Sequence, residues 1–307
     1  MIWTAERNME QGPLLAEAYR RAEALPAGRE AVMAGGLRGA DKTSALAQAG
    51  IDQAQYLVIS IDDILEQMAA RGMIPAIPGL APLEAADLVH AEACFLAKRV
   101  GLRALADGRN VIWDITMASL HSVQSWLAAH RHAGYRVDAI FAEISAGESV
   151  RRSAAMRRRG HEEYRRGRGD GGRYVPPETI RALARGPAGW PPDGVARLLG
   201  DSPAPGGNMP TGVSSGSEVT VMIGAYLAGE MALGALCGKF RARSWPAVPP
   251  VFPPALAGAP SAIDDPEPYV PGSFDDVVGA YDLGWITDPD YEALAAAAAP
   301  GTAGQPG

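Results

Sequence analysis

The stretch that decides the fold is Gly36-Leu37-Arg38-Gly39-Ala40-Asp41-Lys42-Thr43. It matches the pattern G-x-x-x-x-G-K-[ST], except that Asp41 stands in place of the second glycine. An apolar run, residues 31–34, precedes the stretch, and a segment of helical composition, residues 43–49, follows it. A strand, a glycine-containing loop and a helix in this order form a phosphate-binding loop, because the loop N–H groups and the helix N-terminus attract anions.

The loop predicts a nucleotide site with assigned roles. Lys42 is expected to reach the β- and γ-phosphates, and Thr43 to hold Mg²⁺. Asp41 tolerates left-handed backbone, but its carboxylate would repel phosphate or pair with Lys42. The alternative is a glycine-rich turn before a helix, with no ligand. The predicted nucleotide-binding residues are Gly36, Leu37, Arg38, Gly39, Ala40, Asp41, Lys42, Thr43 and Ser44.

The composition of the 307-residue chain allows one large domain or two small ones. A hydrophobic content of 47% with 21% charged residues is typical of a globular protein, and a net charge of −7 argues against a protein that coats nucleic acid. Cys94 and Cys237 have no metal-binding or disulfide spacing, and the N-terminus does not resemble a signal peptide, so a cytoplasmic location is expected. Residues 219–238 are a poor membrane span because Glu230 interrupts them.

The first 200 residues alternate between strand-like and helix-like segments. This alternation predicts an α/β fold of the P-loop NTPase type, with a parallel sheet flanked by helices. Ligands of such sheets bind at the C-terminal ends of the strands. The expected strands are residues 30–34, 56–61, 110–115 and 137–144, with a fifth short candidate at 195–199. The expected helices are residues 42–49, 63–71, 82–106 and 119–132.

The composition changes after residue 200. We expect a P-loop kinase domain over residues 1–200, a Gly/Pro/Ser-rich linker over 201–217, a helical and Pro-rich extension over 218–294, and a flexible tail over 295–307. Within the extension, residues 218–243 are predicted to be helical, 245–271 extended and 273–299 one or two short helices. The extension carries no recognisable catalytic motif.

Carboxylates follow two of the expected strands. Asp62 and Asp63 come directly after an apolar run, where one of them is expected to cap the next helix and the other to accept a proton from a substrate hydroxyl. Asp114 ends a second strand, as does the acidic residue that positions Mg²⁺ in P-loop enzymes. Asp114 and Thr43 are therefore the predicted metal ligands.

An arginine-rich segment follows the fourth strand. Residues 151–173 contain nine arginines and three acidic residues. A nucleic-acid surface is one interpretation, but only Tyr164 and Tyr174 could provide base stacking. The position favours a kinase lid, whose arginines neutralise the charge that develops during phosphoryl transfer and exclude water.

From about Trp3 to Asp201, the chain resembles the zeta-toxin family of P-loop kinases, in particular its actinobacterial members. The resemblance is carried by residues 34–37 with Lys42-Thr43, by 62–64, 68–69 and 72–75, by Leu88-Val89-His90-Ala91-Glu92, by Gly108-Arg109-Asn110-Val111-Ile112-Trp113-Asp114-Ile115-Thr116-Met117, and by Gly171-Gly172-Arg173-Tyr174-Val175-Pro176-Pro177. It implies ATP-dependent phosphorylation of the 3′-hydroxyl of UDP-N-acetylglucosamine, with Mg²⁺. It also implies a small helical antitoxin as a protein partner.

The resemblance also implies roles for single residues. Asp62 resembles the general base, and Arg173 one of two lid arginines. Glu92, Asp114 and Thr116 fall where the family contacts its sugar substrate or places a second strand-end acid. Three positions depart from the family pattern: Asp41, Arg38 in place of Pro or Gly, and Met156 where the other lid arginine is expected. Arg157, next to Met156, is the predicted replacement, so the predicted catalytic residues are Asp62, Lys42, Arg173 and Arg157.

The sequence leaves two functional hypotheses open. The first is a zeta-type kinase that acts on UDP-N-acetylglucosamine. The second is a catalytically impaired or dead P-loop protein that acts by binding a protein partner, and it is motivated by Asp41 and Met156. One lost transition-state donor commonly reduces a rate by about 100- to 1000-fold.

Overall fold

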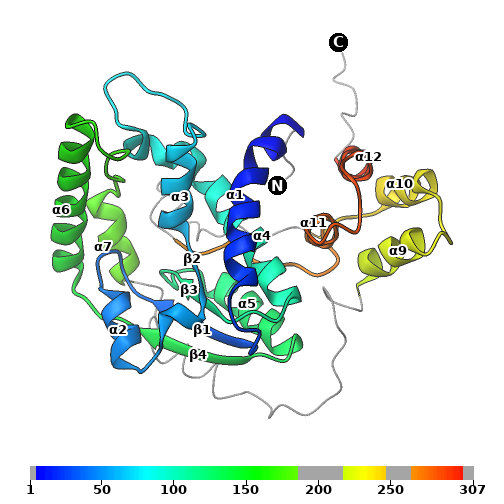
Figure 1. Ribbon diagram of the computed structural model, residues 1–307, viewed down its shortest axis with the longest axis horizontal. Helices are drawn as coiled ribbons and strands as arrows, with labels where there is room; N and C mark the ends of the chain where they lie inside the picture. Colours follow the sequence, from blue (N-terminus) through cyan, green and yellow to red (C-terminus); the bar gives the residue numbers. More distant parts are fainter. Residues whose placement is uncertain (1–4, 186–216, 247–263, 300–307) are drawn as a thin grey trace.

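The computed structural model describes residues 5–185, 217–246 and 264–299, and its centre is a parallel sheet (Figure 1). The four strands lie in the order β2-β3-β1-β4. The expected α/β fold and its first four strands are therefore confirmed, whereas the expected fifth strand, 195–199, lies outside the described residues. The strands are β1 (Glu30–Gly35), β2 (Leu57–Ser60), β3 (Val111–Asp114) and β4 (Arg136–Phe141).

Helices cover both faces of the sheet, because successive strand side chains point to opposite faces. Ala31 and Met33 of β1 belong to the main core, together with side chains of α1 (Ala5–Glu23), α3 (Ile61–Ala70), α4 (His90–Ala106) and α5 (Leu120–His132). Val32 and Ala34 point to the other face and meet Leu46 of α2 (Lys42–Gln48). A strand buried on both faces is apolar at consecutive positions, which is the pattern that the sequence shows.

The helix expected over residues 82–106 is two elements. Residues 82–89 form a 3₁₀ helix, η2 (Pro82–Val89), and α4 begins at His90. Val89 separates them because its dihedral angles, φ −120° and ψ 9°, lie outside the α-helical range. A second short 3₁₀ helix, η1 (Gln53–Gln55), precedes β2, and helix α1 was not expected from the sequence.

In the described part of the chain, α6 (Ala146–Arg165) and α7 (Pro177–Arg185) follow β4, and four more helices lie on the opposite side of the molecule (Figure 1). The single helix expected over residues 218–243 is divided into two, because the chain turns at Gly229, which has a φ of 75°. The one or two short helices expected over residues 273–299 are confirmed as two. These four helices are α9 (Glu218–Leu227), α10 (Leu233–Ala242), α11 (Asp275–Asp282) and α12 (Asp288–Ala298).

The C-terminal helices share a second hydrophobic core with the sheet domain. This core contains Phe240, Val277 and Leu294, and also Phe95 of α4. Among the residues that the structure describes, no helix is long and apolar enough to cross a membrane. Cys94 and Cys237 are both buried and free. The expected linker up to residue 216 and the tail from residue 300 lie outside the described residues.

Candidate functional site

The loop between β1 and α2 has left-handed backbone at three positions, including Asp41, which replaces the second glycine of the motif. Gly36, Gly39 and Asp41 all have positive φ, at 146°, 77° and 62°. Asp41 caps α2, because its side chain accepts a hydrogen bond from the Ser44 N–H at 3.3 Å. An aspartate tolerates this left-handed conformation and is a good helix cap, so the turn survives the replacement.

Lys42 pairs with Asp114, and not with Asp41. Its Nζ lies 2.9 Å from Asp114 Oδ1 and 3.4 Å from the Gly36 carbonyl oxygen. Asp114 stands opposite Ala34 in the β1–β3 register, which brings the strand-end acid to the loop. Burial raises the pKa of Asp114, although Lys42 favours its charged form. Thr43 is an exposed residue in the first turn of α2.

Asp62 is held by two arginines. Arg38 of the loop donates to both carboxylate oxygens, at 2.6 and 2.5 Å, and Arg173 donates to Oδ1 at 2.6 Å. Burial alone would raise the pKa of Asp62, but Arg173 and Arg38 together hold this pKa well below its usual range. Asp62 is therefore ionised at neutral pH and able to accept a hydrogen bond from a hydroxyl group.

Neither Asp62 nor Asp63 caps the helix that follows β2, so that expectation is wrong. Strand β2 ends at Ser60, one residue earlier than expected, and the Ser60 side chain accepts the Asp63 N–H at 3.4 Å. Ser60 occupies the N-cap position because a serine hydroxyl there can reach the N–H groups of the first turn. This leaves both carboxylates free of the capping role.

A cavity of about 280 Å³ lies between Asp62 and the arginine-rich helix α6. Arg38 and Arg173 line it on the side of the sheet, and Met156, Arg159 and Glu163 line it on the side of α6. The spacing of Met156, Arg159 and Glu163 places them on one face of the helix. The cavity thus lies between Asp62, the predicted base, and Met156, where the resemblance implies a second lid arginine.

Arg157, the predicted replacement, points in a different direction from Met156. It pairs with Glu84 at 3.1 Å and lies over the Tyr174 ring at 4.9 Å. Adjacent residues of a helix point about 100° apart, which explains the difference. Arg159 reaches the cavity instead, and sequence reasoning missed it, although its position one turn after Met156 was a usable signal.

Helix α6 also contacts the loop directly. The Ser149 hydroxyl donates to the Arg38 carbonyl oxygen at 2.8 Å, and Arg152 donates to the Gly39 carbonyl oxygen at 2.9 Å. The returning chain is close to α6, because a Cβ on Gly172 would come within 2.5 Å of the Arg157 carbonyl oxygen. The lid is therefore docked on the loop in this conformation.

Two of the residues predicted to bind the sugar have partners within the chain. Glu92 is buried and accepts from Arg7 at 2.8 Å and from Gln11 at 2.7 Å, both on α1. Thr116 is buried and donates to Asp265 at 2.9 Å. Of the three predicted sugar-binding residues, only Asp114 lies beside the loop lysine, and the roles of Glu92 and Thr116 stay predictions.

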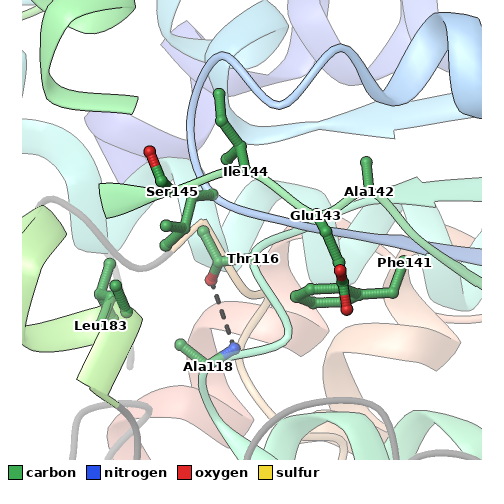
Figure 2. A pocket seen from close by; sticks show the side chains of 10 residues that line it. Thr116, Ala118, Phe141, Ala142, Glu143, Ile144, Ser145 and Leu183 are labelled. Carbon is green, nitrogen blue, oxygen red and sulfur yellow. Dashed lines mark hydrogen bonds between the residues drawn. The ribbon is translucent and has the colours of Figure 1, made fainter. Parts of the chain in front are cut away.

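A second cavity, of about 410 Å³, opens beside the phosphate-binding loop (Figure 2). Its apolar walls come from Leu37 of the loop, from Phe141 and Ile144 after β4, and from Leu183 of α7. Glu143 adds a carboxylate. Concave, mostly apolar sites of about 300–1,000 Å³ with a few polar groups are typical of small-molecule binding. The cavity is large enough for the base of a nucleotide whose phosphates occupy the loop.

A family model described as Zeta toxin matches residues 20–188, which is more than half of the chain. The matched region contains the loop, Asp62, Asp114, helix α6 and Arg173. No curated protein matches the chain.

Proposed function

This chain belongs to the zeta toxin family of P-loop kinases, and we propose that it transfers the γ-phosphoryl group of ATP to a sugar hydroxyl of UDP-N-acetylglucosamine, as the toxin of a toxin–antitoxin pair. The observation that carries the proposal is the pairing of Asp62 with Arg173 at the sheet edge where Lys42 meets Asp114. Phosphoryl transfer requires a group that accepts the hydroxyl proton and cations that hold the phosphoryl oxygens.

Each charged group has a role in this reaction. Asp62 orients the acceptor hydroxyl and accepts its proton as the oxygen attacks phosphorus. Lys42 releases its contact with Asp114 and binds the β- and γ-phosphate oxygens instead. Arg173 stabilises the negative charge that develops on the transferred group. The docked lid excludes water, which would otherwise compete with the sugar as acceptor.

Thr43 and Asp114 fit a Mg²⁺ ion. Mg²⁺ prefers oxygen ligands and is commonly held by one or two protein groups together with phosphates and water. Thr43 is exposed at the start of α2, and Asp114 ends the neighbouring strand β3. The ion would neutralise charge on the phosphate oxygens.

The rival function is protein binding by a chain whose kinase site is impaired. It is favoured by Met156, which lines the cavity at the position of the second lid arginine. It is also favoured by Arg38, which binds both oxygens of Asp62.

ADP formation by the purified full chain tests the proposal. We expect ADP only when ATP, Mg²⁺ and UDP-N-acetylglucosamine are all present, together with a sugar nucleotide heavier by one phosphoryl group in the mass spectrum. Removal of Mg²⁺ with a chelator should stop the reaction. Equal ADP formation with and without the sugar nucleotide would contradict the proposed acceptor, and absence of ADP in every condition would favour the rival function.

Replacing Asp41 by Asn is expected to tighten ATP binding about fivefold, because two unit charges about 4 Å apart in water interact with about 1 kcal/mol. Asn keeps the cap and tolerates the left-handed backbone, so only the charge changes. The measurement is the Kd of ATP by titration calorimetry. Asp52→Asn is the matched control, because Asp52 also caps a short helix but lies outside the loop, and an equal gain there would refute the local effect.

Replacing Met156 by Arg is expected to raise kcat by about 100-fold, the lower end of the range for one transition-state donor, because the position is 48% exposed. The exposure also lets the longer side chain fit without repacking. The measurement is the steady-state rate at saturating ATP and sugar nucleotide. A Met156→Gln variant provides the neutral control, and a similar gain with Gln would show that the added charge is not responsible.

A further inference from the structure

A short segment of the C-terminal extension enters the candidate site. Residues 264–270 run without regular structure from the sheet edge, across α5, towards α11 (Figure 1, orange). Ser122 of α5 donates to the Pro266 carbonyl oxygen at 2.6 Å, and the Trp126 indole donates to the Glu267 carbonyl oxygen at 3.0 Å. The side chain of Glu267 pairs with Lys98 of α4 at 2.8 Å. We call residues 264–270 the acidic strap.

Asp265 anchors the strap to the loop that follows β3. Its carboxylate accepts hydrogen bonds from the Thr116 hydroxyl at 2.9 Å, the Met117 N–H at 2.8 Å and the Ser119 N–H at 2.6 Å. Met117 has a left-handed φ of 57°, and its side chain occupies the place where a Cβ on Gly35 would be. Asp265 therefore fixes the end of the strap against the strand that enters the phosphate-binding loop.

Asp264, the residue before Asp265, contacts Arg173 of the candidate site. Its Oδ1 is 2.7 Å from Arg173 Nη1, the same nitrogen that donates to Asp62 at 2.6 Å. Asp264 is 8% exposed and the side chain of Arg173 is 3% exposed. A line of alternating charges thus runs from Asp264 through Arg173 and Asp62 to Arg38.

Arg173 depends on such partners for its position. It belongs to residues 168–176, which form no helix or strand, so the local backbone does not fix the guanidinium. One of its carboxylate partners, Asp62, changes its hydrogen bonding when it accepts the hydroxyl proton. Asp264 is anchored through the neighbouring Asp265, whose carboxylate is hydrogen-bonded to the loop that follows β3.

We propose that Asp264 is a positioning residue, which holds the Arg173 guanidinium beside Asp62 so that it faces the transferred phosphoryl group. This inference rests on the proposed phosphoryl transfer, and it assigns a role to a part of the chain beyond the region that the family model matches. It also means that the C-terminal extension completes the kinase site.

Steady-state kinetics of Asp264→Asn provide the first test. We expect kcat to fall by about 10- to 100-fold, because small misplacements of a catalytic group have effects of this size, while the KM for ATP stays unchanged. Asp264→Glu should recover part of the loss, because it restores the charge. Glu267→Gln is the matched control, since Glu267 belongs to the same strap but pairs with Lys98, and its kcat should equal that of the original chain. An increase in kcat for Asp264→Asn would overturn the proposal, because the strap would then act as a block.

An NMR measurement separates this inference from the proposed function. Arg173 Nη2 lies 3.3 Å from Nδ1 of the buried His90, so the ¹⁵N signal of His90 reports the position of the guanidinium. In histidine-labelled protein, Asp264→Asn should shift the His90 signal and leave His130, which is buried against Trp126, unchanged. An unchanged His90 signal overturns the proposal even if the original chain is active. If the original chain forms no ADP, the proposed function fails, and the His90 signal still decides whether Asp264 positions Arg173.

Discussion

An Asp62→Asn variant is expected to phosphorylate its acceptor about 100- to 10,000-fold more slowly than the original chain, which is the usual contribution of a general base. Asn has the same shape but cannot accept the hydroxyl proton. In the proposed reaction Asp62 contacts the acceptor and Lys42 contacts the nucleotide, so the loss should appear in kcat, with the Kd of ATP unchanged. The measurements are the rate of ADP formation and an ATP titration of the same preparation.

The neighbouring carboxylate supplies the control for this prediction. Asp63 follows Asp62 in the sequence, but it is an exposed residue. Asp63→Asn should leave kcat within about twofold of the original value, as surface substitutions usually do. If Asp63→Asn abolishes activity and Asp62→Asn does not, the assignment of the base is wrong.

The features of the site that could be predicted from the sequence are those that short-range patterns determine. The apolar runs before Gly36, Asp62 and Asp114 specify buried parallel strands, and parallel strands bring their C-terminal ends to one edge. The contact between Lys42 and Asp114 follows from this arrangement. The left-handed backbone at Asp41 was also foreseeable, because the motif needs it and Asp tolerates it.

The choice of side-chain partners could not be predicted, because it depends on tertiary contacts. Nothing in the local sequence indicates that Arg38 binds Asp62, or that α1 supplies Arg7 and Gln11 to Glu92. Asp264 is a stronger example, since it lies 91 positions after Arg173 in a segment without helical or strand periodicity. Helix geometry predicts that Arg157 and Met156 point in different directions. Which of the two faces Asp62 can be inferred only when the position of α6 relative to Asp62 is known.

Buried ion pairs attach the C-terminal helices to α4. Arg99 of α4 is 4% exposed and pairs with Asp282 of α11, with contacts of 3.2, 3.0 and 2.6 Å. Gln11 accepts a further hydrogen bond from Arg99 at 3.0 Å. The adjacent Lys98 is fully buried between Glu267 and Asp275, at 2.8 Å from each. Two successive cations of one helix are therefore neutralised by the C-terminal extension alone.

Replacing Asp282 by Ala is expected to lower the free energy of unfolding by about 3–5 kcal/mol, because it leaves the buried Arg99 charge without its carboxylate partner. Asp107→Ala is the control, since Asp107 pairs with Arg103 on the same helix α4 at a partly exposed position, where such a pair contributes about 0.2–0.5 kcal/mol. Urea unfolding of both variants gives the comparison. A double variant, Arg99→Met with Asp282→Leu, should recover most of the loss, because apolar side chains of similar volume can replace a buried ion pair. A small loss in Asp282→Ala would mean that Arg99 finds another partner or water, and the C-terminal helices would then be held mainly by the hydrophobic core around Phe95.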